Sequence, residues 1–347
     1  MADHRGESSM PLSSRRKLAA AMCFFLISAS AFSAPPRAKG KKNTMTLPEA
    51  VNFVRPSVVQ LTLTLDQFPE PTRAAVGGRF FLSRALGTGF FVSDEGYVIT
   101  AMHVLKAYQN IPLNLNVNGQ VLPIGRKRLS TGVPVPSMKH AGASLESRGS
   151  FGLIDFDVIE QDPRHDLVLL KLGRNPFKAE NGPGIVVGGQ AMKYDVRAAI
   201  LSAGRPRDGE SVGVSGYPLD NTVLVTTSGT MASSWAYNFV DVQVPGAPPW
   251  FRRPEVDDSY LADVRLNPGN SGGPVYSVEN GAIIGVCVAY DLSPVIYGDG
   301  NGEPATAQNR PLEYNSGLSV LVPITYVIEM LKKHDIKWVE LFPLATR

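Results

Sequence analysis

The sequence has almost no cysteine: two residues in 347, Cys23 and Cys287. Cys23 lies in an apolar N-terminal run, so removal of that run would leave a single thiol and exclude an internal disulfide. A domain without disulfides must be stabilised by core burial, which a chain of this length can supply. Cys287 lies inside the apolar run Ala282–Tyr290. We interpret it as a buried strand residue.

The sequence also lacks a charge excess, since its formal net charge is +3 and only 19% of its residues are charged. It has no stripe of basic and aromatic residues, which argues against nucleic acid as a partner. No His/Cys cluster has the spacing of a zinc site. The acidic run Asp299–Glu303 is interpreted as a turn rather than as part of a calcium loop. We therefore expect no metal and no cofactor.

The first 33 residues are typical of an export signal. Arg15–Lys17 is a positive segment, Leu18–Phe32 is apolar, and small residues follow. We expect residues 1–33 to be a signal peptide and the protein to be exported to the periplasm or the extracellular space. The alternative is an uncleaved N-terminal membrane anchor, although the run is short of the ~20 residues of a bilayer span. Whether Met1 or Met10 is the true start is left open.

Helical periodicity is scarce in the rest of the chain, and its clear case is the apolar face of residues 324–331. Short strand-like runs separated by turn residues dominate, which favours a β-sandwich or barrel. The Pro- and Lys-rich residues 34–46 are interpreted as a linker, and residues 47–347 as one folded domain. Two polar stretches, Arg126–Ser150 and Asn238–Asp257, are interpreted as long surface insertions.

The segment Asn267–Pro274, with the sequence NPGNSGGP, surrounds one serine with glycines. A serine hydroxyl becomes a nucleophile when a base accepts its proton, and the resulting oxyanion needs fixed donors. Glycines permit the tight turn and the close substrate approach that this chemistry requires. We therefore interpret Ser271 as a nucleophile, with the N–H groups of Gly269 and Ser271 as the oxyanion hole. The alternative is a glycine-rich turn in which Ser271 only caps the backbone.

Three histidines are candidates for the base: His103, His140 and His165. His103 follows a strand-like run, where a rigid element would hold a base near a cleft. His140 lies in a polar insertion. Asp166 opens an apolar run, so its carboxylate could accept the imidazole N–H. We assign His103 as base and Asp166 as the orienting acid; taken alone, Asp166 could equally be a strand cap beside an exposed His165.

The three segments occur in the order His, Asp, Ser, which is the chymotrypsin order. They resemble the HtrA/Deg branch of the trypsin-like serine proteases over about residues 47–333. The matching segments are Gly87–Val92, Ile99–Val104, Asp166–Leu172, Asp263–Pro274 and Gly317–Pro323. The resemblance implies an all-β fold of two six-stranded antiparallel β-barrels, about 47–190 and 191–347, with a short C-terminal helix. The triad would lie in the cleft between the barrels.

The resemblance also implies that a peptide substrate binds as an added strand. We expect it to pair with one strand, formed by Ser319, Val320 and Leu321, beside a small or medium apolar pocket. Arg265 lies near the expected wall of that pocket. If its guanidinium entered the pocket, it would favour acidic side chains at the cleavage position. The alternative is that Arg265 points to solvent.

The resemblance argues against two modes of control that are familiar in related proteases. Asn270 stands where digestive relatives carry an aspartate used in zymogen activation, so activation by N-terminal trimming is not expected. The chain ends soon after the predicted terminal helix, so a C-terminal PDZ module, common in HtrA proteins, is not expected either. A homo-oligomer is expected by resemblance alone.

Two functions of different classes follow. The first is an exported serine endopeptidase that cleaves protein or peptide substrates, unfolded chains above all, through an acyl-enzyme, with a role in protein quality control. The second is a peptide-binding scaffold or regulatory protein that keeps the fold with low or no turnover. The intact triad favours the enzyme. The physiological substrate and the roles of the two insertions cannot be derived from the sequence.

Overall fold

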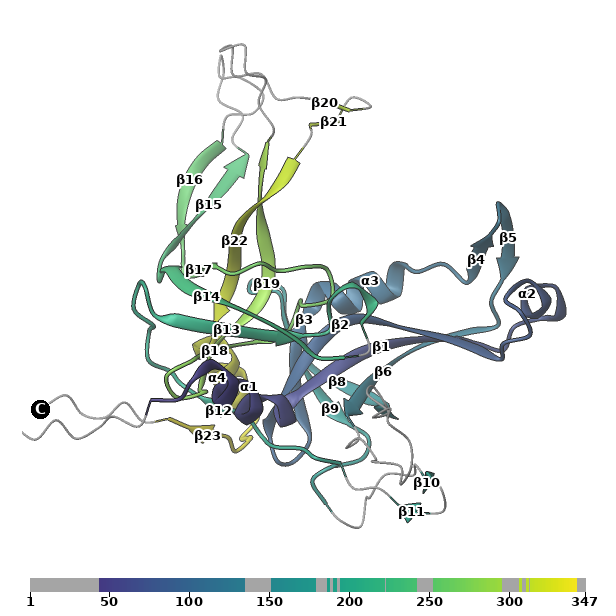
Figure 1. The fold of residues 1–347 in the computed structure, drawn as a ribbon, viewed down its shortest axis with the longest axis horizontal. Helices are drawn as coiled ribbons and strands as arrows, with labels where there is room; N and C mark the ends of the chain where they lie inside the picture. The colour runs from purple at the N-terminus through teal and green to yellow at the C-terminus, as the bar shows by residue number, and fades with distance from the viewer. Residues whose placement is uncertain are drawn as a thin grey trace, which may run out of the picture. The chain divides into compact units, whose positions relative to one another are not determined.

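The computed structural model describes residues 44–134, 151–178, 186–187, 190–191, 194–221, 223–241, 252–294, 306–307, 310–311 and 313–341. The predicted signal peptide, most of the predicted linker, His140 and Asp299–Glu303 lie outside these residues. Two β-sheets contain most of the strand residues of the described chain (Figure 1). Its helices are all too short or too polar to cross a bilayer.

The first sheet has seven strands in the order β7-β6-β1-β2-β3-β9-β8. Their bounds are β1 Val58–Asp66, β2 Phe81–Ser93, β3 Tyr97–Ala101, β6 Arg126–Pro134, β7 Phe151–Ile154, β8 Phe156–Asp162 and β9 Leu167–Leu172. All neighbours are antiparallel. The all-β class is confirmed, but this half has one strand more than expected, and its end strands are not paired with each other within the described residues.

The second sheet contains a closed six-stranded antiparallel barrel, as predicted, because β18 pairs with both β13 and β19. The ring runs β13 (Ser211–Gly216), β14 (Val225–Ser233), β17 (Tyr260–Asp263), β22 (Glu313–Pro323), β19 (Ile283–Pro294) and β18 (Pro274–Ser277). Two short strands, β12 (Ile200–Leu201) and β23 (Val339–Glu340), extend it beside β19 with parallel pairing.

The two polar stretches are not simple loops. Arg126–Pro134 is strand β6, which pairs with β1 over residues 126–132, and residues 135–150 lie outside the described chain. The described residues of the stretch 238–257 belong to two antiparallel strands, β15 (Ala236–Asp241) and β16 (Arg252–Asp257), and residues 242–251 lie outside the described chain. Three further short pairs complete the strands: β4 (Asn114–Val117) with β5 (Gln120–Pro123), β10 (Val186–Val187) with β11 (Gln190–Ala191), and β20 (Thr306–Ala307) with β21 (Arg310–Pro311).

The described chain has four α-helices: α1 (Leu47–Val54), α2 (Glu70–Ala75), α3 (Met102–Asn110) and α4 (Ile324–Lys333), with short 3-10 turns at Arg55–Ser57 and Pro218–Asp220. The α1 helix starts at Leu47 because Thr46 and Glu49 form a capping box around its first turn. The predicted terminal helix is confirmed as α4. The α2 and α3 helices were not expected from the sequence.

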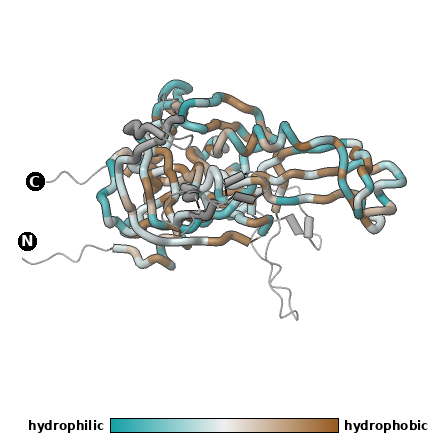
Figure 2. The backbone as a smooth tube through the Cα atoms, turned by 90° about the horizontal axis from the view of Figure 1, so that it is seen from above, coloured by the Kyte–Doolittle hydropathy of each residue, from teal (hydrophilic) through white to brown (hydrophobic). Residues whose placement is uncertain are grey.

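One apolar core joins the two sheets. It includes Val58, Phe90 and Ile99 of the first sheet, Ile283 and Val286 of the second, and residues of both α1 and α4. Figure 2 shows hydrophobic stretches along many strands of the backbone. Such burial is the main source of stability in a domain without disulfides.

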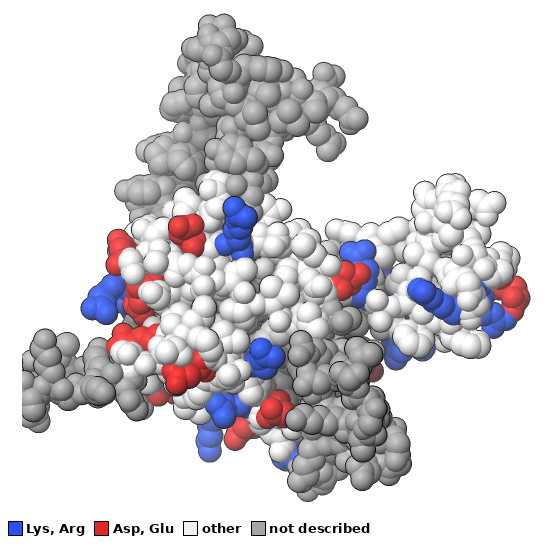
Figure 3. Space-filling model, in the orientation of Figure 1, with Lys and Arg blue, Asp and Glu red and all other residues white. Residues whose placement is uncertain are grey.

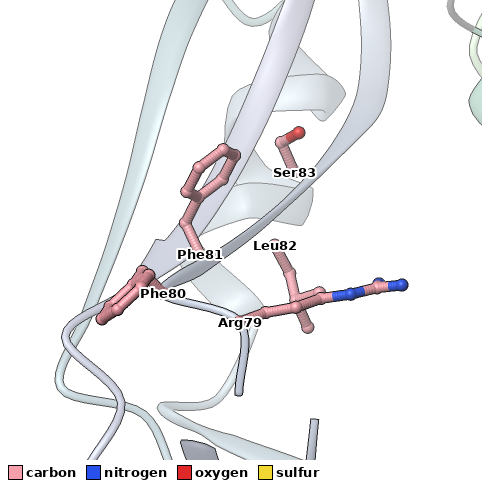
Figure 4. A pocket seen from close by; sticks show the side chains of 5 residues that line it. All are labelled: Arg79, Phe80, Phe81, Leu82 and Ser83. Carbon is pink, nitrogen blue, oxygen red and sulfur yellow. The ribbon is translucent and has the colours of Figure 1, made fainter. Parts of the chain in front are cut away.

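The strands β1 and β2 extend away from this core as an arm, with α2 and the β4–β5 hairpin at its far end (Figure 1). Near the start of β2, Phe80 and Phe81 are 74% and 60% exposed. Together with Arg79 they line an open hollow of about 470 Å³, and their side chains point in different directions (Figure 4). Basic and acidic side chains are interspersed over the face in Figure 3, in keeping with the small net charge.

Candidate active site

His103 lies at the start of α3, directly after β3 ends at Ala101. Its Nδ1 is 2.5 Å from Oδ2 of Asp166, and its backbone N–H donates to Oδ1 of the same carboxylate at 2.9 Å. The N–H of Met102 donates to the backbone carbonyl of Asp166 at 2.8 Å. The first N–H groups of a helix have no partner within the helix and favour a negative group. Asp166 therefore accepts the first N–H groups of this helix and also fixes the orientation of the imidazole.

The turn between β8 and β9 brings Asp166 to this place. The pairing of Ala101 with Leu167 sets the start of β9 beside the start of α3. Asp166 itself has a left-handed backbone, with φ at 55°. Such values are uncommon for residues other than glycine, although aspartate tolerates them better than most. The conformation is imposed by the turn that precedes it.

The loop that carries Ser271 is held by both sheets. From the first sheet, the N–H of Thr88 donates to the Ser271 carbonyl at 2.9 Å, and its Oγ1 donates to the Gly269 carbonyl at 2.6 Å. From the second, the Cys287 carbonyl accepts from the N–H of Gly272 at 2.7 Å. The loop also needs its glycines: Gly269 has φ at 102°, and a Cβ there would lie 2.5 Å from a backbone oxygen of Tyr217.

Two amides of this loop are unused. The N–H of Leu219 donates to the Pro268 carbonyl at 2.8 Å, and the N–H of Gly269 points the opposite way because a trans peptide opposes its two polar groups. Within the described chain, neither the Gly269 nor the Ser271 N–H donates a hydrogen bond. Two free donors on either side of Asn270 are what a developing oxyanion would require.

His103 and Ser271 line the same hollow, of about 390 Å³. Its lining residues are His103, Leu266, Asn267, Pro268, Ser271, Cys287, Val288, Ala289 and Tyr290. The His103 side chain is 42% exposed. Within the described residues, no hydrogen bond joins its ring to the Ser271 hydroxyl. The structure therefore brings His103 and Ser271 to one cleft, with Asp166 bonded to His103, and leaves the histidine and the serine without a hydrogen bond between them.

The structure distinguishes the two candidate bases that it describes. His165 binds Asp162 through Nδ1 at 2.5 Å, and its ring is stacked on Tyr326 with the centroids 3.6 Å apart. It does not line the cleft. His103 is therefore the base candidate that faces Ser271.

The structure contradicts the prediction that Ser319, Val320 and Leu321 pair with the substrate. Ser319, Val320 and Leu321 pair with β17 on one side and with β19 on the other. Their strand has no free edge, so the prediction that it pairs with substrate is wrong. The cleft is instead bordered by residues 287–290 of β19. The sequence did show this segment as an apolar run, but we interpreted it only as a core strand.

Two other predictions concern single side chains. Arg265 is exposed and does not line the cleft, so its role in specificity stays a prediction. Cys287 is buried, as expected, with 2% of its surface exposed. Burial raises the pKa of its thiol far above the usual value, so the group is neutral and unreactive at neutral pH. The described residues contain no group of three or more His, Cys, Asp or Glu that could hold a metal ion.

Comparisons with known proteins agree with this geometry. The trypsin-like peptidase domain family matches residues 87–286, more than half of the chain. A probable periplasmic serine endoprotease, DegP-like, of Halomonas elongata is 26% identical over 221 residues, which are 64% of this chain and 32% of the relative. The protein of the same name in Chlamydia trachomatis is 24% identical over 203 residues, covering 58% and 28%. The chain thus spans about a third of the length of the curated relatives it matches.

Solved structures give weaker similarity. The HtrA-type protease AlgW with a decapeptide has a TM-score of 0.45 at 17% identity, covering 83% of this chain and 67% of that one. The active form of a protease from M. tuberculosis has a TM-score of 0.42 at 18% identity, covering 84% and 86%. The family match carries the assignment. On that match, this chain belongs to the trypsin-like peptidase domain family.

Proposed function

We propose that this chain is a serine endopeptidase in which Ser271 is the nucleophile, His103 the general base and Asp166 the orienting acid. One observation carries the proposal: His103, whose imidazole is bonded to Asp166, lines the same cleft as Ser271. The loop that carries Ser271 also has two unused amides. The family match supports the reaction class.

The reaction follows from these positions. Ser271 Oγ attacks the scissile carbonyl carbon while its proton passes to His103 Nε2, and Asp166 stabilises the imidazolium that forms. The carbonyl electron pair moves to oxygen, which accepts hydrogen bonds from the Gly269 and Ser271 amides. Collapse breaks the C–N bond, and the imidazolium gives its proton to the departing amine. Water, with His103 again as base, then hydrolyses the acyl-enzyme to acid and free serine.

The substrate backbone is expected to pair with β19 at residues 288–290. On one side of this segment, Ala289 and Tyr290 pair with β22, while the segment itself borders the cleft. An extended peptide can therefore add as a further strand. Leu266, Cys287 and Val288 make the adjoining wall apolar, which favours a small or medium apolar side chain at the cleavage position. Acidic preference would instead implicate Arg265, and peptide-library cleavage separates the two.

Location and partners extend the same proposal. Residues 1–33 would be removed as a signal peptide on export, and the relatives reported above are named as periplasmic. Substrates would be unfolded proteins or peptides, because an added strand requires an extended chain. A role in protein quality control and assembly into a homo-oligomer complete the proposal.

One observation favours the second candidate, a peptide-binding scaffold with low turnover. In the described residues the Ser271 hydroxyl is not hydrogen-bonded to His103, and a serine without its base is a poor nucleophile. Such contacts often tighten only when substrate binds, so the enzyme remains our main proposal.

The test is labelling with a fluorophosphonate probe and cleavage of casein by the purified chain. We expect labelling and cleavage by the wild type, neither by Ser271→Ala, and both by Ser83→Ala, a change of an exposed serine on the arm. Full activity in Ser271→Ala would contradict the assignment. A folded wild type that binds peptides but is not labelled would favour the scaffold.

A further inference from the structure

A second histidine–carboxylate pair lies directly beside Asp166 and is not used in the proposed reaction. His165 Nδ1 is 2.5 Å from Asp162 Oδ2. One face of the ring is stacked on Tyr326 of α4, with the centroids 3.6 Å apart and the planes at 19°. His165 precedes Asp166 in the chain, so whatever fixes this ring also fixes the backbone that leads to the proposed catalytic carboxylate.

Tyr326 is in turn held by residues between strands in the C-terminal half of the chain. Its hydroxyl donates to Asp258 Oδ2 at 2.8 Å, and the other oxygen of that carboxylate is 2.5 Å from Arg205 Nη2. The guanidinium of Arg205 lies over the ring of Trp235, with 3.7 Å to the centroid. A continuous series of contacts therefore runs from Arg205 and Asp258 through Tyr326 to the turn that carries Asp166.

Two carboxylates and one phenol in this series keep one protonation state at neutral pH. Burial raises the pKa of Asp162, but its hydrogen bonds from His165 and nearby backbone lower it more, so the net pKa lies below the usual value. The net pKa of Asp258 is lowered in the same way, against burial, by Arg205 and Tyr326. Burial and the bond to Asp258 raise the pKa of Tyr326 to about 12. Both carboxylates are thus ionised, and the phenol stays a hydrogen-bond donor.

The Asp162 carboxylate also fixes the backbone of the turn that leads to Asp166. The Asp162 carboxylate also accepts the N–H groups of Arg164 at 3.0 Å and His165 at 3.2 Å. These bonds shape the turn that ends in the left-handed backbone of Asp166. A left-handed non-glycine residue persists only where its surroundings determine it. Here the surroundings are Asp162 on one side and the stacked Tyr326 on the other.

We propose that His165 and Tyr326 are positioning residues for the proteolytic reaction: their stacked rings clamp the turn 162–166 against α4 and so hold the Asp166 carboxylate at His103. The kinetic part of this inference rests on the proposed function. Its geometric part, the contact between Asp166 and His103, does not.

The decisive variants are Tyr326→Leu, which removes the stacking ring, and Tyr326→Phe, which keeps the ring and loses only the bond to Asp258. Because misplacement of a reacting group by about 1 Å can reduce the rate about a hundredfold, we expect Tyr326→Leu to lower kcat about tenfold to a hundredfold with little change in KM. Tyr326→Phe should retain most of kcat. Lys332→Gln, an exposed change on the same helix, should match the wild type.

A pH profile separates positioning from general destabilisation. If Asp166 moves away, the imidazolium of His103 is stabilised less and loses its proton at lower pH. The acid limb of the kcat/KM profile should therefore move to lower pH in Tyr326→Leu and stay in place in Tyr326→Phe. A lower melting temperature with kcat and the acid limb unchanged would overturn the inference.

An NMR measurement tests the geometry without turnover. The proton between His103 Nδ1 and Asp166 should give a low-field resonance in the wild type and in Ser271→Ala, and it should weaken or move in Tyr326→Leu. If the chain proves inactive but the resonance behaves in this way, the proposed function fails and the clamp stands. If the resonance is the same in Tyr326→Leu as in the wild type, the clamp fails. Should Tyr326→Leu not fold, His165→Gln removes the same stack at a side chain that is 18% exposed and is judged by the same resonance.

Discussion

His103–Asp166 and His165–Asp162 are two histidine–carboxylate pairs with the same 2.5 Å contact between Nδ1 and a carboxylate oxygen. They meet at adjacent residues of one turn, yet their surroundings differ. The His103 side chain is 42% exposed at the cleft that contains Ser271, whereas that of His165 is 18% exposed and lies against Tyr326. A histidine–aspartate contact alone therefore does not distinguish the two pairs. The distinction comes from the groups around the imidazole ring.

The two pairs also differ in how the chain makes them. His165 and Asp162 are three residues apart in one turn, so local geometry brings them together. His103 and Asp166 are separated by 63 positions, and only the pairing of β3 with β9 joins them. The His103–Asp166 pair therefore depends on the fold, whereas the His165–Asp162 pair forms within the turn itself.

The largest effect is expected when each of the two aspartates is replaced separately. Asp166→Asn should lower kcat about 10⁴-fold, because the amide no longer fixes the required tautomer or stabilises the imidazolium. Asp162→Asn should lower it less than about a hundredfold, since this residue acts only on position. Steady-state kinetics on one peptide substrate measures both. Equal losses would mean that the two pairs are not functionally distinct.

A second test leaves both pairs intact and changes the serine loop. The Thr88 hydroxyl donates to the Gly269 carbonyl and accepts the N–H of Tyr217 at 2.9 Å. Thr88→Val keeps the shape but removes these bonds, so the proposed oxyanion hole should loosen. We expect kcat to fall about a hundredfold, as for loss of one oxyanion donor, without a shift of the acid limb.

Thr88→Ser is the matched control, because it restores the hydroxyl. It should recover most of the activity. Equal activity of Thr88→Val and the wild type would show that the first sheet does not order the serine loop.

The smallest expected effect is on stability. The net pKa of Asp162 is lowered in the folded chain, so its contribution to stability is present above the unfolded pKa of about 3.9. It is lost as the pH falls through the lower folded value. Asp162→Asn should lower the free energy of unfolding at pH 7 by about 1 kcal/mol, and the difference from wild type should vanish in acid. Thermal melting between neutral and acidic pH measures this, and a constant difference would contradict it.

The three proposed catalytic residues could be found from the sequence because their signals are local. A glycine-flanked serine, a histidine at a strand end and an aspartate opening an apolar run can each be recognised within ten residues. Their order then limits the fold. The glycines around Ser271 also predict the unusual backbone, as the positive φ at Gly269 confirms.

Features that depend on partners across the sheet were missed. Arg126 and Arg128 make β6 look like a polar loop, but both pair with Asp66 of β1, at 2.8 and 3.2 Å. The sequence could not show which strand has a free edge, because β19 and β22 are both apolar runs. Only the register shows that β22 is central, whereas residues 287–290 of β19 border the cleft.

The terminal helices of the described chain have a consequence for how such a protein can be divided. The N-terminal α1 precedes the first sheet, yet Met45 beside it donates its N–H to Glu279 of the second half. The C-terminal α4 follows the second sheet, yet Lys333 reaches Glu160 on β8. The N-terminal segment therefore contacts the C-terminal half, and the C-terminal helix contacts the N-terminal half. A chimaera with a relative that exchanges one barrel alone would separate these segments from their partners, so successful recombination has to exchange a barrel together with the opposite helix.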